Sequence, residues 1–185
     1  MVERFKINKE KAINSILFVL EKLGGEGDFH KVFKILYFAD QKHLANYGLP
    51  ITGDFYIAMK DGPVPSELYD IFKSLRGDSF FSNPEFQEFF EVRSRYFIKA
   101  IQKPDTEELA ESNIECLLES VEENRHLNFT ALKNKSHQKA WDNAQNDEMS
   151  IYDIAEEGGA SPEMLKYIQL NVENHQAFSH YAKLG

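Results

Sequence analysis

The histidines and the single cysteine are the residues of this chain whose chemistry could serve a reaction. None of the six histidines stands at the spacing of a close metal-ligating pair. His30 and His43 could still meet His137 in space, so a metal site stays open beside the alternative of three structural histidines. Cys116 lies among glutamates, whose negative charge raises the pKa of a thiol and suppresses its nucleophilic form.

Sequence motifs for other enzyme chemistries are missing. The chain contains no GxSxG nucleophile elbow and neither of the glycine-rich patterns GxGxxG and GxxxxGK[ST] that cradle phosphates. The glycine-rich run 24–27 fits a loop between helices, and the carboxylates of Glu26 and Asp28 would oppose a phosphate there. We therefore predict a protein that is not an enzyme and uses no metal or cofactor. A hydrolase that uses His137 with a carboxylate or a metal is kept as an alternative.

An acidic ridge is the most unusual pattern of charge, and we define it as Glu111, Glu115, Glu119, Glu122 and Glu123. Like charges four residues apart destabilise a helix by a few tenths of a kcal/mol per pair. No lysine or arginine lies between residues 103 and 125 to offset them within the helix. Two interpretations are open: a solvated helix face, or a docking surface for a basic partner.

The net charge of −9 arises entirely in the second half of the chain. Residues 1–100 hold 14 basic and 14 acidic side chains, so residues 101–185 carry the whole excess. An acidic half disfavours nucleic acid, because affinity for DNA depends on neutralising phosphates with lysine and arginine. A DNA-binding regulator is therefore a weaker alternative. The acidity could steer a basic protein partner, or it could serve only solubility.

Composition indicates a folded, cytoplasmic protein. Apolar residues make up 42% of the chain, too much for a disordered protein, yet no apolar run approaches the roughly 20 residues that span a membrane. The first residues are typical of an amphipathic helix and not of a signal peptide. A lone cysteine cannot form an internal disulfide, as is usual in the cytoplasm.

Hydrophobic spacing predicts a structure built mainly of helices. We expect a strand at 54–60, a turn at 61–63, and a long strand or hairpin at 86–100. The expected helices cover 9–23, 28–47, a segment from Pro65 to Gly77, 105–123, 128–133, 151–157 and 162–178. The core face of the fourth is predicted as Leu109, Ile114, Leu117, Leu118 and Val121, and a loop is expected through His137 and Trp141. The fold class is α+β, mainly α: a compact helical domain with a small antiparallel sheet or hairpin.

Residues 34–73, KILYFADQKHLANYGLPITGDFYIAMKDGPVPSELYDIFK, resemble the signature of the Panacea domain, the family of SocA-like antitoxins and related phage-associated proteins. The resemblance extends over about residues 9–145, with the acidic helix followed by Ser136, His137 and Trp141. It implies one Panacea-like domain over residues 1–185, with a core motif at 34–73 and a C-terminal helical part at 105–178. Its matching positions are Lys34, Leu36, Tyr37, Ala39, Gly62, Pro63, Val64, Pro65, Tyr69 and Phe72.

The resemblance implies an antitoxin that binds and neutralises a cognate toxin from an adjacent gene. One branch of the family also delivers its toxin to a bacterial protease as an adaptor. The residues of the motif could be purely architectural, since glycine permits a tight turn and proline stiffens it. Alternatively, Tyr37, Lys60, Asp61 and the His137–Trp141 element surround a cleft that accepts a partner segment. The candidate partner-binding residues are Tyr37, Lys60, Asp61, Gly62, Glu111, Glu115, Glu119, His137 and Trp141.

Overall fold

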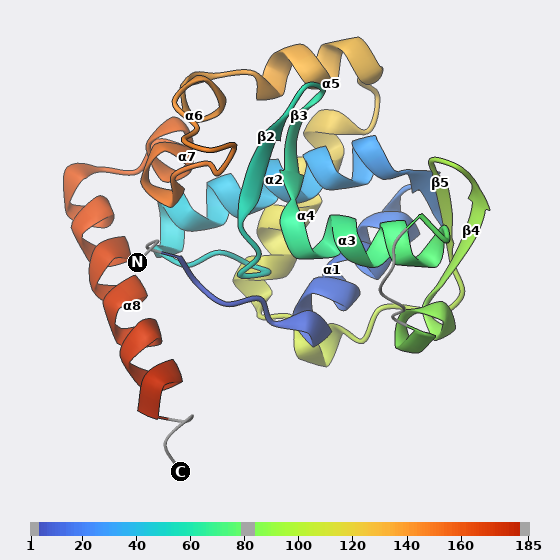
Figure 1. Cartoon of the computed structure of the whole chain (residues 1–185), viewed down its shortest axis with the longest axis horizontal. Helices are drawn as coiled ribbons and strands as arrows, with labels where there is room; N and C mark the ends of the chain where they lie inside the picture. Colours follow the sequence, from blue (N-terminus) through green and yellow to red (C-terminus); the bar gives the residue numbers. More distant parts are fainter. Residues whose placement is uncertain (1–3, 79–83, 182–185) are drawn as a thin grey trace.

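Most of the described chain is helical, as the hydrophobic spacing predicts. The computed structural model describes residues 4–78 and 84–181 (Figure 1). Its elements, with η for 3-10 helices, follow the order α1 (Lys9–Lys22), β1 (Glu26–Asp28), α2 (Phe29–Tyr47), β2 (Tyr56–Met59), β3 (Gly62–Pro65), α3 (Ser66–Leu75), η1 (Pro84–Glu88), β4 (Phe90–Ser94), β5 (Phe97–Ala100), η2 (Thr106–Glu108), α4 (Glu111–Asn124), α5 (Phe129–Ser136), α6 (Lys139–Asp142), α7 (Ile151–Glu157) and α8 (Pro162–Tyr181).

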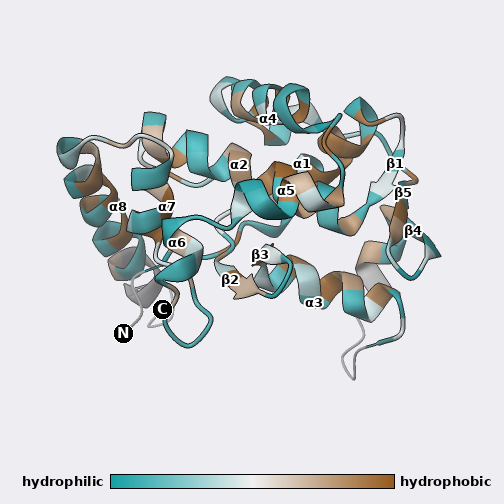
Figure 2. Cartoon of the chain, turned by 90° about the horizontal axis from the view of Figure 1, so that it is seen from above, coloured by the Kyte–Doolittle hydropathy of each residue, from teal (hydrophilic) through white to brown (hydrophobic). Residues whose placement is uncertain are grey.

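The helix α2 runs through the middle of the molecule. The carboxylate of Asp28 caps its start by accepting hydrogen bonds from the backbone N–H groups of His30 and Lys31. Gly48 ends it with a φ of 70°, a conformation that glycine adopts without steric cost. Figures 1 and 2 place α4 on one side of α2 and the β2–β3 hairpin with α3 on the other. Because α2 contacts α4 and β3, and its Phe33 packs against Tyr69 and Phe72 of α3, it positions the side chains that these elements present to solvent.

Two clusters of buried side chains form the core, and α2 contributes to both. Phe33 and Leu36 pack with α1, α3 and α4, whereas Phe38 packs with α7 and α8. Figure 2 shows hydrophobic residues mainly where the helices face one another. Complete burial of such a side chain contributes about 1.5–3 kcal/mol to the stability of the fold. Because α2 contributes buried side chains to both clusters, it connects them. The division into one domain over residues 1–185 is not tested by these contacts and stays a prediction.

The strands form two small antiparallel sheets, which confirms the α+β, mainly α, fold class. In the hairpin, β2 pairs with β3 so that Met59 lies opposite Gly62, with Lys60 and Asp61 at its tip. The segment predicted as a strand or hairpin at 86–100 is the hairpin β4–β5, and β1 adds a third strand in the order β1-β5-β4. No helix in the described part of the chain is both long enough and apolar enough to cross a membrane.

The third helix starts later than predicted. Pro65 is the last residue of β3, and α3 begins at Ser66. The side chain of Asp54 explains this start, because its carboxylate accepts hydrogen bonds from the backbone N–H groups of Glu67 and Leu68. A distant carboxylate thus caps the helix, while Pro65, with no N–H group to donate, ends the strand.

The predicted helix at 105–123 is also wrong at its start. The chain forms η2, becomes extended at Leu109, whose side chain is buried, and begins α4 at Glu111. Leu118 does not belong to the core, because α4 turns Leu117 and Val121 inward and leaves Leu118 38% exposed. The loop expected through residues 137–141 contains the short helix α6.

Candidate partner-binding cleft

A cleft of about 500 Å³ lies at the N-terminal end of α2. Its floor is formed by the first turns of α2. Its walls are the tip of the β2–β3 hairpin, α3, the turn between β4 and β5, and the start of α5. A concave site of this size on the surface suits a small ligand or a protruding segment of another protein.

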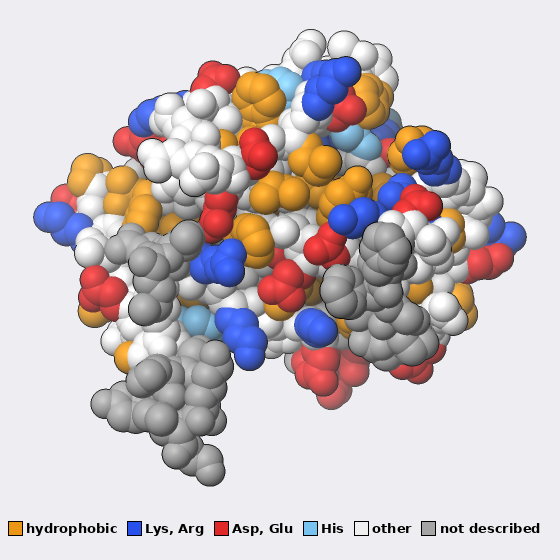
Figure 3. Space-filling model, viewed as in Figure 1, with side chains coloured by type: hydrophobic (Ala, Val, Ile, Leu, Met, Phe, Trp, Pro, Cys, Tyr) orange, Lys and Arg blue, Asp and Glu red, His pale blue; other side chains and the backbone are white. Residues whose placement is uncertain are grey.

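Exposed apolar side chains surround the mouth of this cleft. Met59 is 37% exposed, Phe129 51% and Tyr96 55%, and all three line the cleft. Figure 3 shows hydrophobic side chains gathered over the β2–β3 hairpin and toward the start of α2. A group of exposed apolar side chains typically marks an interaction site, because a protein without a partner there would bury such side chains in its own core.

The tip of the hairpin is fixed to α2 and α5. The carboxylate of Asp61 forms an ion pair of 2.8 Å with the Lys133 ammonium, which lowers the pKa of Asp61. The Nε2 of His30 donates to the Asp61 carbonyl oxygen at 3.0 Å, and its ring stacks on Phe129 with centroids 4.1 Å apart. Burial lowers the pKa of His30, so the ring is neutral near pH 7. The predicted residues Lys60 and Asp61 therefore sit on a preorganised edge of the cleft.

Gly62 and Lys34 fix the same hairpin next to its tip. Gly62 has a φ of +97°, and a Cβ added there would lie 2.4 Å from Ser136 Oγ and 2.8 Å from Lys34 Cε. Lys34 is completely buried, and its Nζ donates to the Pro63 carbonyl oxygen at 2.7 Å. Burial lowers the pKa of Lys34 to about 7. Glycine is needed at position 62 because both the backbone and its neighbours exclude a larger residue.

The His137–Trp141 element supports the strand β2 of the hairpin. The two rings stack with centroids 4.0 Å apart and an angle of 9° between their planes. Trp141 Nε1 donates to the Met59 carbonyl oxygen at 3.0 Å. The pKa of His137 is lowered by burial and by the nearby Lys133 and Lys34 ammonium groups. This pair therefore holds the strand that carries Met59, next to the cleft.

Tyr37 lies away from this group. Its side chain is buried, and its hydroxyl donates to the carboxylate of Glu157 on α7 at 3.2 Å. Burial and the Glu157 carboxylate raise the pKa of Tyr37 well above its usual value. Two other motif residues, Val64 and Tyr69, line the cleft, whereas Phe72 is completely buried in the core. The structure therefore separates Tyr37 from Lys60, Asp61 and Gly62.

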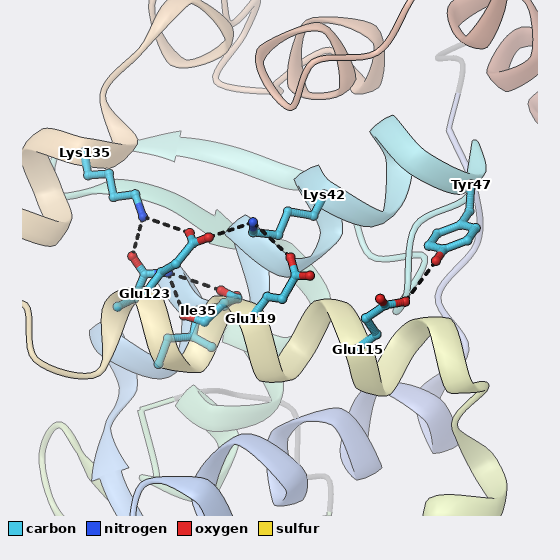
Figure 4. Close-up of polar contacts among 9 residues, drawn as sticks. Ile35, Lys42, Tyr47, Glu115, Glu119, Glu123 and Lys135 are labelled. Carbon is cyan, nitrogen blue, oxygen red and sulfur yellow. Dashed lines mark hydrogen bonds and ion pairs between the residues drawn. The ribbon is translucent and has the colours of Figure 1, made fainter.

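Two lysines of the protein itself form ion pairs with the acidic ridge (Figure 4). Lys42 Nζ lies 3.2 Å from a Glu119 carboxylate oxygen and 2.8 Å from one of Glu123. Lys135 lies 3.5 Å from Glu123, and the Tyr47 hydroxyl donates to Glu115 at 3.1 Å. The ridge thus faces the second half of α2 and α5 and does not join the cleft. Glu111 is exposed at the start of α4.

The histidines considered for a metal site serve separate contacts. His43 Nδ1 bonds to the Leu49 carbonyl oxygen at 2.6 Å, and its Nε2 contacts Ser112 Oγ and the Asn113 amide. Within residues 4–78 and 84–177, whose side chains are described, no group of three His, Cys, Asp or Glu residues could hold a metal ion. Burial and two ridge glutamates raise the pKa of the Cys116 thiol to about 11, in the direction that the sequence indicates.

Sequence reasoning missed several residues of the cleft: Met59, Arg76, Tyr96 and Phe129. Each lies at or next to the end of a helix or strand, outside the periodic apolar stripes that mark a core. The available signal for the cleft was an aromatic residue, Tyr96 or Phe129, at or next to the end of a helix or strand. The spacing of single residues does not reveal that these ends meet around one hollow.

Comparison with known proteins identifies a family for this chain. A family model described as "Antitoxin SocA-like, Panacea domain" matches residues 32–142, more than half of the chain. The match begins in α2, ends in α6 and includes the β2–β3 hairpin, α3 and α5. No curated protein and no solved structure matches the chain. On the extent of the family match, the chain belongs to the SocA-like antitoxin, Panacea domain family.

Proposed function

We propose that this chain is an antitoxin that binds and neutralises a cognate toxin through the cleft at the start of α2. The observation that carries the proposal is the exposed apolar rim of that cleft, within a fold that belongs to an antitoxin family. Aromatic side chains are enriched among the residues that dominate binding energy in protein interfaces. Met59, Tyr96 and Phe129 are of the required size and are available to a partner.

The rigidity of the cleft favours tight binding. Its hairpin is fixed by the Lys34–Pro63 hydrogen bond, the Asp61–Lys133 ion pair and the Trp141–Met59 hydrogen bond. A surface that is ordered before the partner arrives loses little conformational entropy on association. We infer that the toxin segment docks onto a preformed site, and that the bulk of the antitoxin then blocks access to the toxin.

Co-expression tests the function directly. The product of the adjacent gene should arrest growth alone and should be harmless when this chain is present. With the purified pair, Phe129→Ala should weaken binding at least about tenfold, because an aromatic anchor of an interface contributes on the order of 2 kcal/mol. Leu118→Ala on α4 is the matched control, since Leu118 is also an exposed apolar residue but lies outside the cleft.

Two outcomes would contradict the proposal. One is a neighbouring product that is harmless by itself or equally toxic with the antitoxin present. The other is an equal loss of affinity in the Phe129→Ala and Leu118→Ala variants while both stay folded by circular dichroism. The second result would keep an antitoxin but move its binding surface away from the cleft.

Three finer points remain part of the proposal. We expect the complex to form in the cytoplasm, where a single free thiol such as Cys116 stays reduced. The protease-adaptor role predicts that the toxin half-life in cells shortens when the chain is present, and an unchanged half-life would leave simple inhibition. Docking of a basic partner on Glu111, Glu115 and Glu119 also stays a prediction, and it competes with the internal partners of Glu115 and Glu119.

A further inference from the structure

The cleft contains more cationic than acidic side chains, in contrast to the chain as a whole. Its lining includes Lys34, Lys60 and Arg76 against Asp28 and Asp61. Both carboxylates are already engaged. Asp28 caps α2 through hydrogen bonds of 2.8 and 3.4 Å, and Asp61 is paired with Lys133. Lys60 has no carboxylate partner among the described residues, so an arriving ligand meets its positive charge at the rim of the cleft.

The two lysines have no close counter-ion. No carboxylate of the described residues lies within 4.0 Å of the amine of Lys34 or Lys60. Lys60 is exposed at the hairpin tip, whereas Lys34 lies beneath it, with Pro63 as its hydrogen-bond acceptor. Because burial lowers the pKa of Lys34 to about 7, that amine carries only part of a positive charge near neutral pH, and the exposed Lys60 is the lysine that a ligand meets.

Arg76 supplies a third cation at the opposite end of the cleft. Its side chain is only 9% exposed and lies over the rings of Phe29 and Tyr96, at 5.2 and 5.9 Å from their centroids. One guanidinium nitrogen donates to the Arg95 carbonyl oxygen, and another pairs with the half-exposed Asp78 at 3.2 Å. Its buried Nε has no hydrogen-bond partner among the described residues. Both terminal nitrogens of Arg76 are therefore already bound and its Nε is buried, so this guanidinium is held by the protein itself.

We propose that the cleft recognises an acidic, apolar segment of the toxin, with a carboxylate directed at Lys60 and apolar side chains packed against Met59, Tyr96 and Phe129. This inference rests on the proposed antitoxin function and names the chemistry of its partner. The partner segment has the opposite charge from one that would dock on the acidic ridge.

Single-stranded nucleic acid is the other class of ligand that favours cations beside aromatic rings. Two observations argue against it here. The chain carries a net charge of −9, and carboxylates of Asp28 and Asp61 lie within the cleft itself. A polyanion would bring phosphates close to both carboxylates, since its affinity depends on many phosphate contacts at once. A protein segment needs only one carboxylate, placed at Lys60.

Charge reversal on the hairpin tip tests the inference. We would measure the Kd of the purified chain for the adjacent-gene toxin by calorimetry, at low and at high salt. Lys60→Glu should weaken binding at least about tenfold at low salt, since like charges across an interface are strongly unfavourable. The difference from the unmodified chain should shrink at high salt because salt screens an exposed charge. Lys103→Glu is the matched control, because it makes the same charge change at an exposed lysine outside the cleft.

A second measurement identifies the partner carboxylate. Each Asp and Glu of the toxin would be replaced in turn by Lys, and one replacement should restore binding to the Lys60→Glu variant. Restoration would support the inference, because only a direct charge contact is repaired by exchanging both signs.

Three results would overturn it. If the toxin binds the unmodified chain but Lys60→Glu weakens binding no more than Lys103→Glu does, the antitoxin function stands and the acidic segment does not. If the toxin does not bind the unmodified chain, both proposals fail. If a fluorescent single-stranded oligonucleotide binds and is lost in Lys60→Glu while toxin binding is unchanged, the cleft is a nucleic-acid site.

Discussion

The acidic ridge on α4 and the cleft at the start of α2 differ in how their charged side chains are paired. On the ridge, Glu119 and Glu123 form ion pairs with lysines of α2 and α5, so that the negative charge of these two residues is compensated inside the molecule. In the cleft, Lys34 and Lys60 have no carboxylate within ion-pair distance among the described residues. A run of like charges in a sequence is therefore a poor guide to a free charged surface.

The exposed apolar side chains are also arranged differently in the two regions. The cleft groups Met59, Tyr96 and Phe129 around one hollow, whereas Leu118 is exposed on α4 outside that hollow. A partner gains affinity from several apolar side chains that it covers together, more than from one isolated contact. The difference suggests that binding should respond to changes in the cleft and tolerate changes on the ridge.

The largest expected effect on stability is at Gly62, which follows the tip of the β2–β3 hairpin beside the cleft. Gly62→Ala should lower the free energy of unfolding by about 3 kcal/mol, because its backbone conformation disfavours a side chain and its Cβ would collide with Ser136 Oγ. Gly77→Ala is the control, since it has a φ of +79° but no atom of the described residues within 4 Å of the added Cβ. It should lose only about 1 kcal/mol. Urea denaturation measures both, and equal losses would mean that crowding under the hairpin is unimportant.

A pH series tests the buried cation of the cleft. The unfolded chain keeps the Lys34 proton up to its ordinary pKa of 10.5, whereas the folded chain releases it near 7. Between these values the unfolded state binds more protons, so raising the pH stabilises the fold. The unfolding free energy of the unmodified chain, relative to Lys34→Met, should rise by about 1 kcal/mol per unit from about pH 7.5 to 8.5.

The comparison with Lys34→Met removes other titrations from that series. His30 and His137 have lowered pKa values and titrate below the window, and the raised pKa of Cys116 lies above it. A difference that stays flat with pH would show that Lys34 remains protonated in the folded state. The surroundings of Lys34 would then stabilise its positive charge more strongly than the contacts in the structure indicate.

Removing the cation of the ridge should have a smaller effect. Lys42→Ala leaves Glu119 and Glu123 without their shared partner and should lower the unfolding free energy by about 1 kcal/mol at low salt. Added salt should reduce this loss because these side chains are partly exposed. Lys103→Ala, on the surface away from the ridge, should change stability little. Equal thermal shifts in the two variants would indicate that the ridge is not compensated by α2.

The smallest effect is expected at the exposed start of the ridge. Glu111→Gln removes a negative charge from the first turn of α4, which favours such charges by about 0.3 kcal/mol. Toxin affinity should stay within about twofold of the unmodified chain. A loss of tenfold or more in the calorimetric Kd would revive the ridge as the docking surface and erase the contrast with the cleft.

Local signals explain why much of the helical structure was predictable. Asp28 and Gly48 bound α2 as expected, and the Ser150 side chain caps α7 by accepting from the backbone N–H of Asp153. Capping and the spacing of apolar residues act over a few neighbouring positions, which the sequence displays directly. The predictions failed where a distant group decides: Asp54 caps α3 from 13 and 14 residues away.

The sequence by itself determined the helical character, the motif at 34–73 and the lack of familiar catalytic patterns. It also placed Lys60, Asp61 and Gly62 together, since they are neighbours in one turn. Only the tertiary structure decided which charges have partners. Lys42 reaches Glu123 across 81 positions, and Lys133 reaches Asp61 across 72. The physical reason is range: capping and periodicity are local, whereas a cleft and its ion pairs exist only after distant segments have packed.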